Sequence, residues 1–207
     1  MILLALLVLG ERAPLTPVTV RNESELLTSD DYVTRAAGLG KSGYTVVEVF
    51  VDATGKPHTC GVAGTSGSKD LDLRACAAAV RRGKYTPAAD ENGVPVHGVL
   101  RLRIRWVLES FFDSPAGIPK WPADLVLEVA KLPEGRKSVT VELVYFVDEQ
   151  GQIQRCSVQQ SSGFQAFDTS ACAAMTKLQR YPPAKDKADK IWPVVRTQRI
   201  EFTPGQK

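Results

Sequence analysis

Phe50-Val51-Asp52-Ala53-Thr54-Gly55 recurs 96 residues later as Phe146-Val147-Asp148-Glu149-Gln150-Gly151. The match continues without a gap over residues 44–106 (copy one) and 140–202 (copy two), with about a third of the aligned positions identical. A duplicated unit is an internal control, because chemistry common to both copies must use residues that both copies keep. The 207-residue chain therefore predicts two small domains of ordinary size.

Each copy begins with the pattern of two strands joined by a tight turn. Residues 44–51 and 139–147 are rich in β-branched and aromatic side chains, which predicts a strand in each copy. Asp52 and Gly55, repeated as Asp148 and Gly151, predict a hairpin turn, because aspartate suits the turn's start and glycine its left-handed position. The next strand carries Cys60 or Cys156, and a Ser-Gly loop follows it.

A helix and a final strand complete each copy. In copy two, the apolar residues Phe167, Ala171, Ala174 and Leu178 recur on one helical face. Pro87 and Pro183 follow the helices and prevent them from continuing. The order β-β-α-β predicts an α+β fold of two tandem small domains, each a three-stranded antiparallel sheet with a helix packed on one face.

The last strands differ between the copies. In copy one, Leu100, Leu102, Ile104 and Trp106 alternate with Arg101, Arg103 and Arg105, which predicts a half-buried strand with a basic outer face. The corresponding stretch of copy two is more mixed and reads Arg196, Thr197, Gln198, Arg199, Ile200, Glu201 and Phe202.

The cysteines are Cys60 and Cys76 in copy one and Cys156 and Cys172 in copy two. The repeated spacing favours the disulfides Cys60–Cys76 and Cys156–Cys172, with free buried thiols as an alternative. His58 and His97 suggest a metal or Cys–His catalytic site, but copy two has Gln154 and Pro193 at these positions. Neither site can therefore be common to both copies, and both histidines are expected at the surface. Disulfides imply an oxidising compartment.

Composition indicates a soluble globular protein, with 43% hydrophobic and 24% charged residues. The net charge of +3 is too small to predict a nucleic-acid partner. Residues 1–9 form an apolar run that resembles the core of a secretory signal; a weak membrane anchor or a buried N-terminal strand are alternatives. We expect a signal-like leader over residues 1–20, a domain over 21–108, a linker over 109–123 and a second domain over 124–207, with a short helix around Asp31 to Ala37.

The order and spacing of these motifs resemble the C-terminal domain of TonB proteins. The resemblance rests on Val-Asp-x-x-Gly after a strand, then Ser-Gly, an alanine-rich helix, Tyr-x-Pro-Ala and a strand ending in Ile-x-aromatic. These motifs occur at Asp52, Ser66, Ala75, Tyr85 and Ile104 in copy one, and each recurs in copy two.

This resemblance implies a periplasmic protein that binds a protein or an extended peptide, such as a TonB-dependent outer-membrane receptor. In that family, an extended peptide pairs with the edge formed by the last strand, so that backbone hydrogen bonds provide affinity. The matching stretches run from Leu100 to Trp106 and from Arg196 to Phe202. No cofactor, metal, nucleic acid or small-molecule substrate is expected.

Three alternative functions follow from the same residues. The basic outer faces favour a structural or cell-wall-associated module that meets an anionic polymer. A truncated TonB energy transducer is another reading of the resemblance. An enzyme is the third, because Ser161, Ser162 and Asp168 suggest part of a triad, but copy two has no histidine to act as the base.

Overall fold

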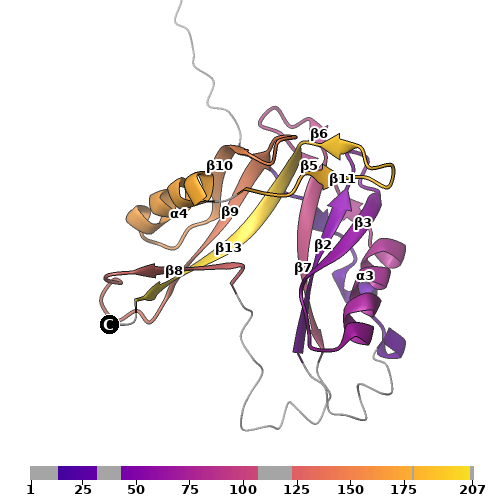
Figure 1. The fold of residues 1–207 in the computed structure, drawn as a ribbon, viewed down its shortest axis with the longest axis horizontal. Helices are drawn as coiled ribbons and strands as arrows, with labels where there is room; N and C mark the ends of the chain where they lie inside the picture. The colour runs from indigo at the N-terminus through magenta and orange to yellow at the C-terminus, as the bar shows by residue number, and fades with distance from the viewer. Residues whose placement is uncertain (1–13, 32–42, 107–122, 179, 206–207) are drawn as a thin grey trace, which may run out of the picture.

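The computed structural model describes residues 14–31, 43–106, 123–178 and 180–205. Copy one contains the strands β2 (Gly43–Val51) and β3 (Pro57–Gly64), the helix α3 (Lys69–Arg82) and the strand β7 (Gly98–Trp106). Copy two repeats them as β9 (Val139–Val147), β10 (Ile153–Gln160), α4 (Gln165–Leu178) and β13 (Val194–Pro204). The predicted α+β class and the β-β-α-β order of each copy are confirmed (Figure 1).

Local chemistry explains why these residues turn where they do. The Asp52 carboxylate accepts hydrogen bonds from the backbone N–H groups of Thr54 and Lys56, at 2.8 and 3.0 Å. Asp148 accepts the same bonds from Gln150 and Gln152. Gly55 has a φ of 86°, which glycine adopts without strain.

Short elements surround this repeated framework. The strand β1 (Thr19–Val20) pairs with β4 (Tyr85–Thr86), and α1 (Glu23–Leu26) and η1 (Ser29–Asp31) follow β1. Two hairpins occupy matching positions, β5 (Ala88–Ala89) with β6 (Pro95–Val96), and β11 (Ala184–Lys185) with β12 (Ile191–Trp192). The strand β8 (Leu125–Val129) precedes copy two.

The two antiparallel sheets join into one sheet of seven strands. Its order is β10-β9-β13-β7-β2-β3, and β8 also pairs with β13. The junction is a short parallel pairing of β7 with β13, in which Gly98 is opposite Val195 and Val99 is opposite Arg196. Beyond this point the two strands diverge, as Figure 1 shows.

Gly98 permits the close approach at the junction. A Cβ atom at this position would lie 2.5 Å from Val18 Cγ2 and 3.2 Å from the Val195 carbonyl oxygen. Copy two has Val194 at the matching position. The junction therefore uses a residue that only copy one has.

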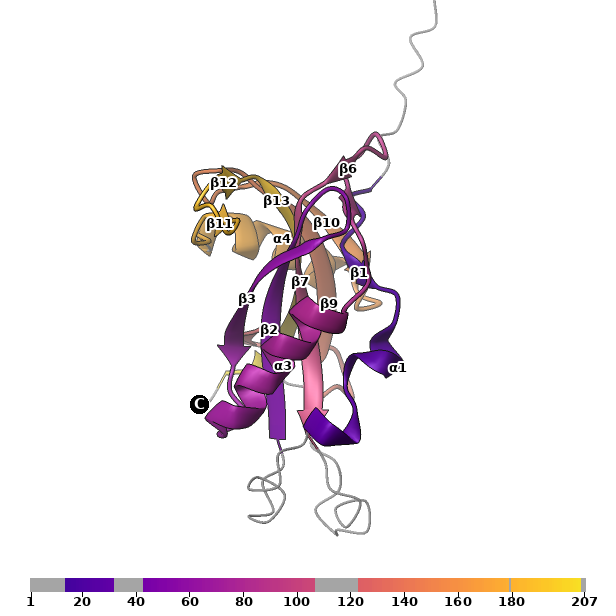
Figure 2. The same cartoon turned by 90° about the vertical axis from the view of Figure 1, so that its right-hand side faces the viewer.

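The two cores lie on opposite faces of the joined sheet. Leu102 and Ile104 of β7 belong to the core under α3. Val99, which points to the other face of the same strand, belongs to the core under α4. Because side chains alternate along a strand, the helices must cover opposite faces. Figure 2 shows α3 in front of the sheet and α4 behind it.

Each core also contains side chains from the other copy. Phe50 and Val99 are buried in the core of copy two, whereas the equivalent Phe146 and Val195 pack with the core of copy one. Because equivalent residues are exchanged, the copies are related by an approximate two-fold rotation. The exchange was not predicted from the sequence.

The domain limits remain predictions, but some of their residues can be placed. Leu15 and Val18, within the expected leader segment, are buried in the core of copy one. The expected linker lies mostly outside the described residues, as do residues 1–13 and most of the expected helix around Asp31 to Ala37.

Candidate functional site

The strands β7 and β13 carry all the residues predicted to bind a partner. On β7, Leu102, Ile104 and Trp106 are buried in the core of copy one, and Leu100 is partly buried. On β13, Ile200 and Phe202 are buried in the core of copy two, whereas Thr197, Arg199 and Glu201 are partly exposed. The predicted alternation of β7 is confirmed.

The edge of β13 is occupied by another part of the chain. β8 runs parallel to β13, pairing Ile200 with Leu125 and continuing to Pro204 with Val129. Asp124, just before β8, donates its backbone N–H to the Arg199 carbonyl oxygen at 2.9 Å. β13 therefore has β9 on one side, and β7 followed by β8 on the other.

The corresponding edge of β7 is different. Beyond Val99, β7 pairs with β2 on one side, and no strand pairs with its other side in the described ranges. The Val195 N–H binds the His97 carbonyl oxygen at 3.0 Å, so the backbone of His97 points toward this second side. Because alternate residues of a strand point their backbone groups to the same edge, Arg101, Arg103 and Arg105 present theirs there.

Arg101 and Arg103, which were expected on a basic outer face, are held in ion pairs. Arg103 contacts the Asp124 carboxylate at 2.6 Å, and Arg101 contacts it at 3.1 Å. The Arg101 Nε also donates to Glu48 at 3.0 Å, and Arg196 of copy two contacts Glu48 at 3.1 Å. The Asp124 side chain is only 4% exposed, so this network connects the copies across the junction.

The buried Arg196 side chain also faces a polar cluster of copy two. Its guanidinium carbon lies 5.0 Å from the centre of the Tyr181 ring. The hydroxyl groups of Tyr145 and Tyr181 both donate to the Gln198 side-chain oxygen. Burial, together with the negative charge that Tyr181 would carry when ionised, raises the pKa of Tyr145 well above its usual value. Arg196 and Gln198 are thus part of the packed interior.

The histidines are partly buried, which corrects the expectation that they lie at the surface. His58 contacts the Asp52 carboxylate at 2.7 Å, and Gln154 makes the equivalent contact with Asp148 in copy two. His97 is stacked between Phe50 and Trp192, with ring centroids 5.7 and 4.2 Å away. The physical reason is the junction, which brings the β11–β12 hairpin of copy two over His97.

Ser161 and Ser162, which suggested part of a catalytic triad, instead bind a carboxylate at the start of α4. Ser161 and Ser162 donate their hydroxyl groups to the Asp168 carboxylate, at 2.6 and 2.7 Å. Thr65 and Ser66 do the same for Asp72 in copy one. Among the described residues there is no group of His, Cys, Asp and Glu side chains that could hold a metal ion.

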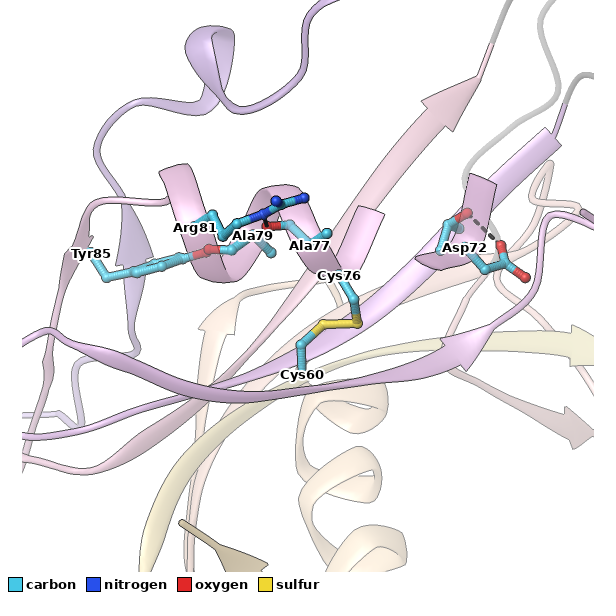
Figure 3. The surroundings of a disulfide bond; sticks show 8 residues. Cys60, Asp72, Cys76, Ala77, Ala79, Arg81 and Tyr85 are labelled. Atoms are coloured by element: carbon cyan, nitrogen blue, oxygen red, sulfur yellow. Dashed lines mark hydrogen bonds between the residues drawn. A yellow bond between two sulfur atoms is a disulfide. The ribbon is translucent and has the colours of Figure 1, made fainter. Parts of the chain in front are cut away.

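Both predicted disulfides are present. Cys60 is bonded to Cys76, and Cys156 is bonded to Cys172. Figure 3 shows the first bond connecting β3 to the middle of α3, between Asp72 toward one end of the helix and Arg81 toward the other. Each bond ties the outermost strand of one copy to its helix.

Sequence reasoning missed Asp124 and β8. The alternating stretch Asp124-Leu125-Val126-Leu127-Glu128-Val129 has the period of a strand and could have indicated β8. It falls outside the duplicated residues, so the comparison of the copies gave no information on it. Glu48 was also missed, because copy two has Val144 at that position.

Comparison with protein families gives one match, in two parts. The model of the Gram-negative bacterial TonB protein C-terminal domain matches residues 29–108 and again residues 134–204. Comparisons with curated proteins and with solved structures found no significant match. None of the described helices has the length and apolar character needed to cross a membrane.

The family is non-enzymatic, is associated with the bacterial envelope and acts through protein–protein contacts. Both matches coincide with the copies, and together they span more than half of the chain. The chain belongs to the TonB C-terminal domain family and carries that domain twice.

Proposed function

We propose that the protein acts in the periplasm and binds an extended segment of another envelope protein, such as an outer-membrane receptor, by strand pairing. The family match supports a protein-binding role in the envelope. The two disulfides support an oxidising compartment. The signal-like run at residues 1–9 agrees with export.

The observation on which the proposal rests is the pairing of β8 with β13. This pairing shows that the edge of a last strand accepts an added parallel strand in this protein. The equivalent edge of β7, from Leu100 to Ile104, has no strand partner in the part of the chain that the structure describes. We assign this edge as the primary binding site, with the backbone of Arg101 and Arg103 providing the hydrogen bonds.

The edge of β13, from Arg196 to Phe202, is a secondary site in this proposal. A partner strand can pair with it only after β8 leaves, because each backbone group forms its ladder bond with one strand at a time. The Asp124 ion pairs with Arg101 and Arg103 oppose this departure.

The polymer-binding alternative is less well supported by the charges. Arg101 and Arg103 would have to meet the anionic polymer, but both are already paired with carboxylates and are about one fifth exposed. Binding to purified peptidoglycan is therefore expected to be weak.

The test is a titration of the isotopically labelled full chain with extended peptides from the periplasmic ends of outer-membrane receptors. Strand pairing predicts chemical-shift changes at the amides of Arg101 and Arg103. The matched control is the same peptide with alternate backbone nitrogens methylated, which removes its donors and keeps its side chains. If the methylated peptide binds equally well, or if the β7 amides do not respond, strand pairing at β7 is wrong.

A further inference from the structure

The approximate two-fold relation of the copies makes Arg103 equivalent to Arg199. Asp124 uses both residues in different ways. Its backbone and its carboxylate bind the backbone of Arg199, at 2.9 and 2.8 Å, and the same carboxylate binds the side chain of Arg103. The residue just before the strand added to β13 is thus bound by a side chain of copy one.

The two-fold relation predicts a second arrangement with the roles exchanged. There, a residue paired with the backbone of Arg103 would meet the side chain of Arg199 from copy two. In this second arrangement, Thr197 would take the position that Arg101 has beside Asp124. This second arrangement would lie on the face covered by α3, because the rotation exchanges the faces of the sheet.

A cavity of about 150 Å³ lies at that place. It opens where β7 and β13 diverge, and its lining includes Leu100, Arg103, Thr197 and Arg199. Residues 17–19, which lead into and begin β1, contribute to the lining on the α3 face. One water molecule occupies about 30 Å³ in the liquid, so this cavity has room for a short polar side chain.

The charges of the lining favour an acidic side chain. The Arg199 side chain forms no ion pair with any residue in the described ranges, and the buried Arg103 Nε has no hydrogen-bond partner there. Glu142 is the carboxylate of the lining and lies opposite Arg199 on β9. Because Arg103 is already paired with Asp124, Arg199 is the cation of the lining that an added acidic side chain would meet, as Arg103 is for Asp124.

We propose that this cavity binds the side chain of an acidic residue at the start of a strand that pairs with β7. Arg199 of copy two binds the carboxylate of that residue. The inference rests on the proposed function, because it specifies the partner segment for the same edge. It makes the second copy a contributor to the binding site of the first.

The probe is a capped synthetic peptide with the sequence of residues 124–129, Asp-Leu-Val-Leu-Glu-Val, since this segment already pairs with a last strand in the protein. Its comparison peptide has asparagine in place of the first aspartate. Both are titrated into the full chain, and into the variants Arg199→Gln and Arg81→Gln. Arg81 is an exposed arginine of α3, so its variant removes the same charge away from the cavity.

We expect the full chain and Arg81→Gln to prefer the aspartate peptide by about fivefold, the upper range for a partly exposed ion pair. Arg199→Gln should bind both peptides equally. The shifts of the β7 amides report whether strand pairing occurs at all.

The outcomes separate the two proposals. Equal binding of both peptides by the full chain, with β7 amides shifted, overturns the role of the cavity and leaves strand pairing intact. A preference that persists in Arg199→Gln overturns the role of Arg199. If neither peptide shifts the β7 amides, the proposed function fails, and the inference fails with it. The peptide comparison needs no protein variant, so it remains decisive even if Arg199→Gln does not fold.

Discussion

Equivalent residues of the two copies have different environments. Asp72 accepts hydrogen bonds from Thr65, Ser66 and also Thr45, whose oxygen accepts a further bond from Trp106 Nε1 at 2.8 Å. Burial raises the pKa of Asp72, but these hydrogen bonds lower it more, so the carboxyl group stays ionised below its usual range. Copy two has Val141 and Phe202 where copy one has Thr45 and Trp106, so the buried polar chain becomes an apolar contact.

His97 connects the copies through its ring, and burial lowers its pKa from the usual 6.5. The unfolded chain binds a proton near pH 6.5, whereas folded His97 resists protonation until a lower pH. The stability that neutral His97 contributes to the fold is therefore fully present above pH 6.5. It is lost as the pH falls through the lowered pKa of folded His97. We expect the melting temperature to fall between pH 7.5 and 5.5 by less in His97→Phe than in the natural protein.

The matched control for His97 is His58→Gln, which installs the side chain that copy two uses at the equivalent Gln154. Calorimetry across the pH range measures both variants. If His97→Phe loses as much stability on acidification as the natural protein, the His97 ring is not the sensitive group.

At the scale of the elements, each disulfide holds an edge strand to the helix that covers it. β3 and β10 are the outermost strands of the sheet, and each has a sheet neighbour on one side. A disulfide between cysteines 16 residues apart is expected to stabilise the fold by about 3 kcal/mol, chiefly by reducing the conformational entropy of the unfolded chain.

We expect Cys60→Ala/Cys76→Ala and Cys156→Ala/Cys172→Ala each to lower the free energy of unfolding by about 3 kcal/mol. Denaturant titrations measured under oxidising and reducing conditions provide the check. Each double variant should retain a reducing-agent response of about half that of the natural protein. A double variant with unchanged stability would falsify the stabilising role of that bond.

The elements show what the sequence could predict. Alternation, turn residues and the duplicated cysteines specify local structure, so β2, α3, their counterparts and both disulfides were predicted correctly. The pairing of β7 with β13 extends over Gly98, Val99, Val195 and Arg196 only, and it depends on how two folded surfaces fit. No local periodicity encodes such a fit, which is why the ion pairs of Arg101 and Arg103 across the junction could not be foreseen.

For the whole molecule, the exchange of core residues ties the stability of one copy to the other. Phe50 is only 4% exposed and belongs to the core of copy two, although it lies in copy one. Val195 is fully buried in the core of copy one. Neither core is complete without residues from both copies, so the molecule should unfold as one unit.

We expect Phe50→Ala to lower the free energy of unfolding by about 3–5 kcal/mol while leaving a single transition. The equivalent Phe146→Ala should cost less, because Phe146 is only partly buried. Nuclear magnetic resonance signals from β2 and β9, followed through the same denaturant titration, test this. Separate midpoints for the two strands would show that the copies unfold independently.

The pairing of β8 with β13 has a consequence for stoichiometry. A tandem repeat suggests a bivalent protein, in which two weak sites on one chain strengthen binding through a high effective concentration. With β8 in place, the chain offers one vacant last-strand edge within the described residues, so saturation should occur at one peptide per chain. If β7 is the binding edge, as proposed, duplication has produced a monovalent binder, in which the second copy shapes the site of the first instead of adding another.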